Sequence, residues 1–271
     1  MTPDKEQPRT QAFAPPGRGF GGRAFDPRLL EGPIPRSLFL LAVPIMGGNI
    51  LQIAYQLVDA FWVGRLGAAA VASVSVSMPL MFLMMSIGMG FTIAGSTLIA
   101  QYVGARNRPM VDHVAGQTLL TVVAVSAALG LFGFVVAPYL LALMEVAPDV
   151  YHNALGFLRV QFLSLPLAFT YFCFQSQMRG VGQVTVPLYI IAGSVMVNFI
   201  VNPFFIFRLG LGVTGSALAT MTSQFISAVV AVTLLTQGRF GIQIRLRELR
   251  PDFAFIKRAF NLGYPAAIEG S

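Results

Sequence analysis

A single carboxylate lies deep inside a long apolar stretch of the sequence. Residues 37–64 contain Asp59 and no other acidic or basic side chain. Burial in a low dielectric disfavours an ionised carboxylate unless a cation or hydrogen-bond donors compensate it, and ionisable groups inside membrane segments usually serve a function. The sequence therefore predicts that Asp59 carries a proton or binds sodium, with a structural hydrogen bond near the outer interface as the alternative. Tyr55 lies one helical turn earlier on the same face, where its phenol can approach the carboxylate.

Two asparagines and a threonine could complete such a site. Asn198 and Asn202 are four residues apart, so one helix would present both amides on one face. Pro203 follows and would free backbone carbonyls toward a cavity, although amides also form contacts between membrane helices. Thr220 belongs to a hydroxyl-rich face of the next apolar segment, and such hydroxyls often bond to their own backbone. The pattern thus offers polar ligands on two further helices, with helix packing as the competing interpretation.

Other kinds of chemistry lack the residues that they need. The two histidines, His113 and His152, have no cysteine or carboxylate at metal-ligand spacing. The lone cysteine, Cys173, lies in an apolar segment and is interpreted as a small buried hydrophobe. The sequence contains no phosphate-binding glycine loop and no evident nucleophile–base pair. We therefore expect no enzyme activity, no cofactor and no metal beyond sodium at the Asp59 site.

The composition indicates that these residues lie on membrane-spanning helices. The chain is 55% hydrophobic and 11% charged, with a mean hydropathy of +0.71, whereas soluble domains carry about a quarter charged residues. A span needs about 20 mostly apolar residues. Six segments qualify, namely 37–64, 73–102, 114–144, 154–178, 184–207 and 213–236. We predict an all-α integral membrane protein, a six-helix transmembrane lobe.

The basic residues predict how the chain is oriented and divided. Fifteen of the 18 lysines and arginines fall on one side of the predicted segments, which the positive-inside rule places in the cytoplasm. This placement explains the net charge of +7 without nucleic-acid binding. We expect a multi-pass protein of the cell inner membrane with a cytoplasmic N-terminus. The expected parts are a disordered cytoplasmic tail (1–36), the lobe (37–238), a basic cytoplasmic linker (239–254) and the truncated start of a seventh helix (255–271).

Short motifs in a fixed order connect the chain with a known family. They occupy residues 41–44, 58–67, 95–105, 178–183, 198–203 and 210–220. In their order and spacing they resemble the first half of the multidrug and toxic compound extrusion (MATE) family, and the resemblance covers residues 37–271. It implies a twelve-helix architecture of two lobes, of which this chain would supply the amino-terminal one.

The resemblance also implies a cation-binding and coupling site on this lobe. The matching positions in this chain are Tyr55, Asp59, Asn198, Asn202 and Thr220, with Pro44 as a hinge in the first helix. Family members commonly carry an acid where this chain has Asn202. One formal negative charge instead of two should weaken sodium binding, so we expect proton coupling through Asp59, with sodium as the alternative ion.

The resulting prediction is a proton- or sodium-coupled antiporter that exports amphipathic cationic drugs by alternating access. Charged Asp59 would accept the drug, and protonation or cation binding would bend the first helix near Pro44 and release the drug outward. The alternatives are a lipid-linked saccharide flippase of the same superfamily and a non-transporting membrane half-protein. The expected partners are the drugs, membrane lipid, and a second half or a second copy of the chain.

Overall fold

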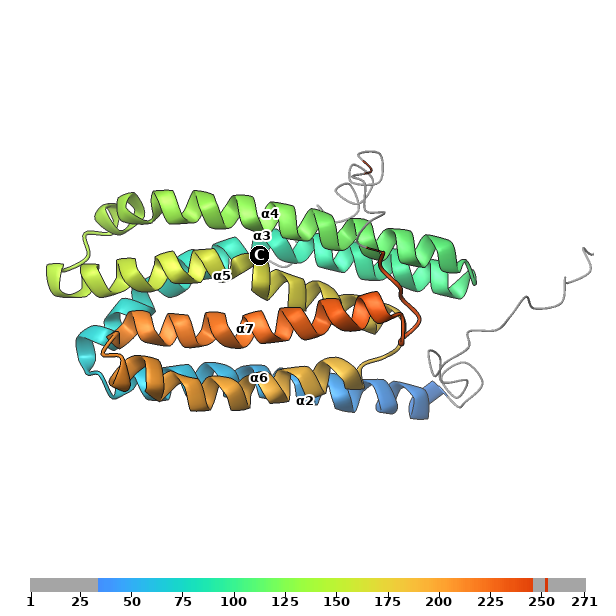
Figure 1. Cartoon of the computed structure of the whole chain (residues 1–271), viewed down its shortest axis with the longest axis horizontal. Helices are drawn as coiled ribbons and strands as arrows, with labels where there is room; N and C mark the ends of the chain where they lie inside the picture. Colours follow the sequence, from blue (N-terminus) through green and yellow to red (C-terminus); the bar gives the residue numbers. More distant parts are fainter. Residues whose placement is uncertain (1–33, 246–251, 253–271) are drawn as a thin grey trace, which may run out of the picture.

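Long antiparallel helices make up the part of the chain that the structure describes. The computed structural model describes residues 34–245 and Asp252. The helices are α2 (Ile34–Gly64), α3 (Ala68–Gly104), α4 (Arg108–Leu143), α5 (Pro148–Gly180), α6 (Thr185–Pro203) and α7 (Gly212–Gln237), with a π-helical turn η1 (Phe204–Arg208) after α6 (Figure 1). Of the expected tail (1–36), residues 1–33 lie outside the described residues, whereas residues 34–36 belong to the first turn of α2. The expected start of a seventh helix (255–271) also lies outside the described residues.

The six long helices match the predicted segments in number and order, but they extend beyond the apolar runs. Helix α3 begins five residues before its predicted segment and α4 begins six before its own. Three or four residues separate consecutive helices from α2 to α6, and η1 follows α6 directly, so the backbone stays helical until the turn itself. We call the end where α4 begins and α7 ends the linker end of the lobe.

Five of the described helices are long and apolar enough to cross a membrane. Helix α2 is 31 residues long but is not one of these five. Its apolar sequence is interrupted by Asn49, Gln52, Gln56 and Asp59. Helix α2 therefore carries a carboxylate and three amides within an otherwise apolar sequence, which agrees with a site-bearing role.

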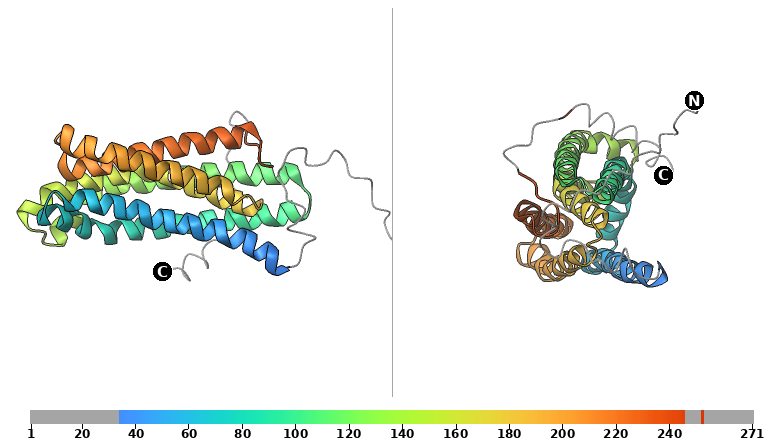
Figure 2. Two further views of the ribbon diagram at one scale, coloured as in Figure 1. Left: turned by 90° about the horizontal axis from the view of Figure 1, so that it is seen from below. Right: turned by 90° about the vertical axis from the view of Figure 1, so that its right-hand side faces the viewer.

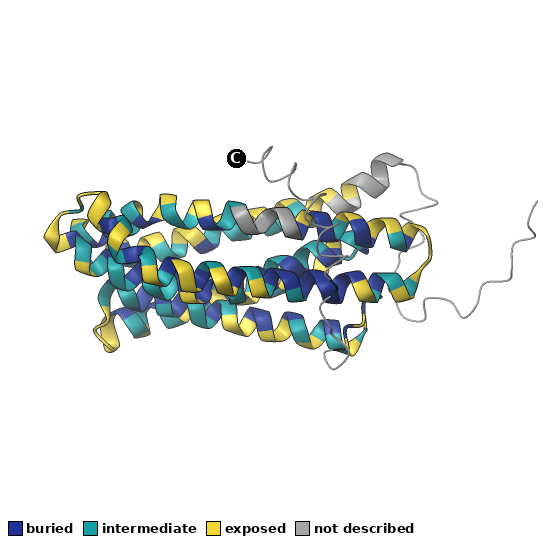
Figure 3. Cartoon of the chain, turned by 90° about the horizontal axis from the view of Figure 1, so that it is seen from above, coloured by how far each residue is buried: buried dark blue, intermediate teal, exposed yellow. Residues whose placement is uncertain are grey.

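Helix α5 lies at the centre of the lobe. It packs against α3, α4 and α7, whereas α2, α6 and α7 form a second layer beside it (Figure 2). In its most apolar window 61% of the residues are buried, against 22–39% in the other four spans. The large buried side chains Phe162, Phe169 and Phe174 all come from α5. The outer helices carry the exposed residues that alternate with buried ones along the bundle (Figure 3).

Glycines let α5 approach its neighbours closely, and one of them allows a stability test. A methyl group added at Gly130 in α4 would overlap the backbone carbonyl oxygen of Phe162, which cannot rotate away. Gly193 in α6 has nothing within 4 Å of such a methyl. We expect Gly130→Ala to destabilise the lobe by about 1–3 kcal/mol, measured as thermal unfolding in detergent. Gly193→Ala is the matched control, and equal unfolding temperatures for the two variants would contradict the close packing of α4 on α5.

Candidate functional site

Three helices converge on the Asp59 carboxylate. The Asn202 amide nitrogen donates to Asp59 Oδ1 at 2.7 Å, and the Asn198 amide nitrogen donates to the same oxygen at 3.1 Å. The Thr220 hydroxyl donates to Asp59 Oδ2 at 3.0 Å. The carboxylate of α2 is thereby held by two amides of α6 and one hydroxyl of α7, and all three donors are uncharged.

Tyr55 joins this cluster from one turn below Asp59. Its hydroxyl accepts a hydrogen bond from the Asn198 amide at 3.1 Å and donates to the Thr220 carbonyl at 3.4 Å. The two amides are also connected, because Asn202 Nδ2 donates to Asn198 Oδ1 at 3.1 Å. The structure thus brings all five sequence-predicted site residues into one network, while their role in ion coupling stays a prediction.

Burial differs between the carboxylate and the side chains that hold it. Asn198 and Asn202 are 0% exposed, and Thr220 and Tyr55 are buried as well. Asp59 itself is only half-buried. The local cause is the four-residue spacing of each pair on α2 and α6, which turns both side chains of a pair toward the neighbouring helix. The ligating groups are therefore fixed, whereas the carboxylate remains reachable from one side.

The backbone after Asn202 changes from an α-helix to the π-helical turn η1. Pro203 cannot donate its backbone nitrogen, which weakens the helix at this point, and single π-turns in α-helices occur frequently at functional sites. The turn lies directly against α7, since a methyl group at Gly215 would come within 2.7 Å of the Phe205 carbonyl oxygen. This close contact holds the segment that follows Asn202 against the helix that carries Thr220.

The hydrogen-bonding capacity of the cluster suits one proton or one small cation. Asp59 is its only formal charge. Asn202 Oδ1 is buried and has no hydrogen-bond partner among the described residues. A 180° rotation of that amide would exchange a donor for an acceptor facing Asp59, since the two amide atoms occupy nearly equivalent positions. The cluster can therefore adapt to a charged carboxylate, which needs donors, or to a protonated or cation-bound one, which needs an acceptor.

An aromatic cluster, which the sequence analysis did not identify, lies beyond Asp59 on α2. The Trp62 ring packs against Phe61, Phe199 and Phe207 with centroid distances of 5.1, 5.8 and 6.1 Å. The Arg65 guanidinium lies 4.8 Å from the Phe61 centroid and 5.4 Å from that of Trp62. Because α2, α6 and η1 all contribute rings, this cluster stabilises the packing between the helices that carry Asp59 and Asn202. Its signal in the sequence was the pair Phe61-Trp62 one turn after the carboxylate.

Pro44 lies apart from the cluster. It is 15 residues before Asp59 on the same helix, a separation of about 22 Å at 1.5 Å per residue. Helix α2 continues through Pro44 without interruption, so the role of Pro44 as a hinge stays a prediction. Among the described residues no group of three or more histidines, cysteines and acids could hold a metal ion.

Comparisons with known proteins agree with this fold. Residues 44–204 match the family model MatE. The chain is 33% identical over 242 residues to "Probable multidrug resistance protein YoeA" of Bacillus subtilis (strain 168), covering 86% of this chain and 52% of that protein. It is 21% identical to "Multidrug export protein MepA" of Staphylococcus haemolyticus (strain JCSC1435), covering 87% and 52%.

A solved structure shows the same arrangement of helices. It is described as the outward-facing conformation of a multidrug resistance MATE family transporter of the MOP superfamily. It matches with a TM-score of 0.82 at 24% identity, covering 89% of this chain and 54% of that one. The chain therefore spans about half the length of the relatives that it matches.

Proposed function

Since this chain belongs to the MatE family of membrane transporters, we propose that it forms the amino-terminal lobe of a cation-coupled exporter of amphipathic cationic drugs. The observation that carries this proposal is the half-buried Asp59 carboxylate, which α6 and α7 hold through three neutral donors. A charge held in this way can exchange a small cation for a cationic ligand. The names of relatives, which refer to multidrug resistance and multidrug export, support the substrate class. Members of the family are transporters and not enzymes.

The proposed coupling ion is the proton. In the structure the side chains of Asn198, Asn202 and Thr220 all point hydrogens toward Asp59. Sodium at this place would need oxygen atoms there instead, so both amides would have to rotate away from the carboxylate. A proton needs no such rearrangement of both amides, because one acceptor, the partnerless Asn202 Oδ1, is enough for the new hydroxyl.

The proposed cycle is alternating access with α2 as the moving element. Helix α2 carries both Asp59 and Pro44, and a proline inside a helix removes one backbone hydrogen bond, which makes bending there easier. Protonation of Asp59 would weaken its hold on the donors of α6 and α7 and so release α2. A ligand shifts this equilibrium only by its different affinity for the two states, and the charge of Asp59 supplies that difference for a cationic drug.

The remaining parts of the proposal concern topology and partners. The basic residues near the linker end favour a cytoplasmic position for that end, in the inner membrane and with the N-terminus inside. The polar side chains Asn49 and Gln56 on α2 are exposed, which is unfavourable toward lipid. A second lobe covering α2 would remove this exposure, and a second copy of the chain is the alternative cover.

Dye transport and dye binding test the proposal together. The chain is produced in a bacterial membrane, everted vesicles are loaded with a proton gradient, and movement of ethidium is followed by fluorescence. Binding of ethidium to the purified chain is measured in parallel by fluorescence anisotropy. We expect saturable binding that protons oppose, and gradient-dependent movement once a second lobe is present. Absence of saturable binding at every pH tested would contradict the proposed substrate class.

A further inference from the structure

The chain that follows α7 crosses the linker end of the lobe and lies against the beginning of α4 (Figure 1). We call residues 238–245 together with Asp252 the strap. The strap is neither helical nor part of a strand. Two glycines with positive φ, Gly238 at 68° and Gly241 at 85°, turn the chain out of α7, a conformation that other residues rarely adopt.

One part of the strap is anchored in the apolar core. Ile242 and Ile244 are 1% and 2% exposed and belong to the same core cluster as Leu235 of α7. The Ile244 backbone nitrogen also donates to the Leu235 carbonyl at 3.0 Å. Burial of apolar surface is the dominant favourable term in folding, so this anchor holds the strap firmly to α7 and to the core.

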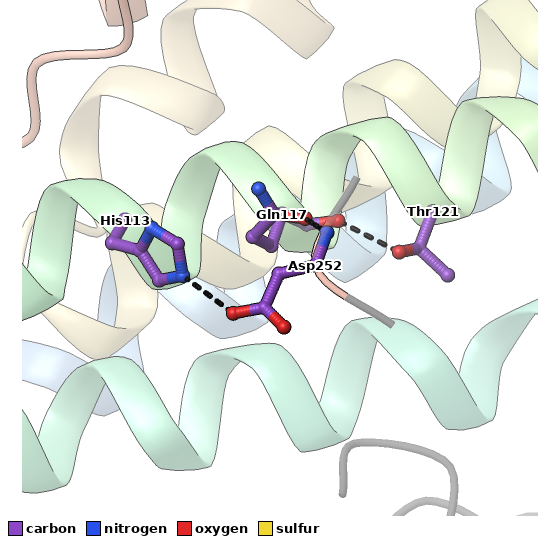
Figure 4. Close-up of polar contacts among 4 residues, drawn as sticks. All are labelled: His113, Gln117, Thr121 and Asp252. Atoms are coloured by element: carbon purple, nitrogen blue, oxygen red, sulfur yellow. Dashed lines mark hydrogen bonds and ion pairs between the residues drawn. The ribbon is translucent and has the colours of Figure 1, made fainter. Parts of the chain in front are cut away.

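The other part of the strap is held by polar contacts with α4. The Gln243 backbone nitrogen donates to Asp112 Oδ1 at 2.7 Å. The Asp252 backbone nitrogen donates to Gln117 Oε1 at 3.0 Å, and the Asp252 carboxylate lies 3.3 Å from His113 Nε2 (Figure 4). Three neighbouring side chains near the start of α4 thus bind two points of the strap.

Beside these polar contacts, the strap and the start of α4 enclose open space and are not packed continuously. A cavity of about 490 Å³ lies there, lined by Arg108, Pro109, Asp112, His113, Gln117, Gln243, Ile244 and Arg245. Hydrogen bonds beside such a space can be exchanged for bonds to water at a small net cost, and exposed ion pairs such as His113–Asp252 contribute little. The contacts with α4 can therefore open while the isoleucine anchor stays in place.

We propose that the strap is a releasable tie that couples α7 to α4 at the linker end. Helix α7 belongs to the layer that carries the Asp59 cluster, through Thr220, whereas α4 belongs to the layer around α5. The tie joins the two layers at one end, and its release loosens α7 against α4 without touching Asp59. This role depends on the fold alone and is independent of the coupling ion and of the substrate.

Hydrogen–deuterium exchange of the 271-residue chain in lipid nanodiscs tests the tie. We expect Asp112→Ala to accelerate exchange in peptides covering 238–245 by roughly tenfold, because a hydrogen bond to a charged acceptor is lost. Exchange in peptides of α2 and α6 should stay unchanged. Asp112→Asn keeps an acceptor oxygen and should exchange like the unaltered protein, and Asp149→Ala removes an exposed acid at the opposite end as a matched control.

A second variant tests the tie independently, in case Asp112→Ala does not fold. Gln117→Met replaces a buried acceptor by an apolar side chain of similar length, and it should accelerate exchange in peptides that contain Asp252 while the unfolding temperature is retained. Unchanged exchange of the strap in both Asp112→Ala and Gln117→Met would overturn the proposal. Equal acceleration along the whole chain would overturn it too, because these residues would then stabilise the lobe in general.

Discussion

Asp59→Asn is expected to abolish the effect of protons on ethidium binding and to weaken the binding itself. The substitution keeps the size of the side chain and removes the only formal charge of the cluster. Loss of one partner of a buried charged pair costs about 2–5 kcal/mol, which corresponds to a roughly 30-fold or larger rise in the dissociation constant. The measurement is fluorescence anisotropy of ethidium with the purified chain over a range of pH.

The physical reason lies in what surrounds the carboxylate. Asn198, Asn202 and Thr220 are neutral, so none of the described side chains that bond to Asp59 can attract a cation or release a proton at ordinary pH. The sign of the pH effect follows. Low pH neutralises Asp59 and releases the dye in the unaltered protein, whereas the Asp59→Asn variant binds weakly at every pH.

An acid outside the cluster supplies the control. Asp149 lies in the first turn of α5 and is exposed, so Asp149→Asn should leave both affinity and pH dependence unchanged. Both variants must reach the membrane and unfold near the temperature of the unaltered protein. Tight, pH-dependent dye binding by Asp59→Asn would remove Asp59 from the proposed coupling mechanism.

Most residues of the Asp59 cluster could be predicted from the sequence, because the spacing of polar residues on α2 and α6 places them on one face of each helix. Tyr55 and Asp59 on α2, and Asn198 and Asn202 on α6, are each four residues apart, and only one face of each apolar helix is polar. Polar side chains inside a membrane bundle need hydrogen-bond partners within the protein, because lipid provides none. The resemblance to the MATE family then supplied Thr220, which the hydroxyl pattern of α7 alone did not single out among its neighbours.

Other features depend on tertiary contacts that no local pattern encodes. The π-turn η1 arises where Pro203 interrupts the helix and α7 approaches at Gly215, and the proline alone did not predict it. The sequence of the strap predicts a solvated basic loop. Its two buried isoleucines, Ile242 and Ile244, are too few for a periodic signal, and Asp112 of α4, which binds Gln243 of the strap, is 131 residues away in the sequence.

Asn202→Asp is expected to make the stability of the lobe depend on sodium. The Asn202 amide nitrogen is 2.7 Å from Asp59 Oδ1, so the substitution places two carboxylates side by side. Two such carboxylates cannot both stay ionised without a compensating cation, and one of them is driven to bind a proton. Sodium should therefore stabilise this variant at neutral pH by about 1–3 kcal/mol when it is present well above its dissociation constant.

Thermal unfolding in sodium chloride and in choline chloride of equal concentration measures this effect. Asn107→Asp is the matched control, because Asn107 is the exposed N-cap of α4 and an acid caps a helix equally well. The unaltered protein and Asn107→Asp should unfold at the same temperature in both salts. If sodium stabilised the unaltered protein as strongly as Asn202→Asp, one carboxylate would be sufficient for sodium binding, and the argument for proton coupling from the single charge of Asp59 would fail.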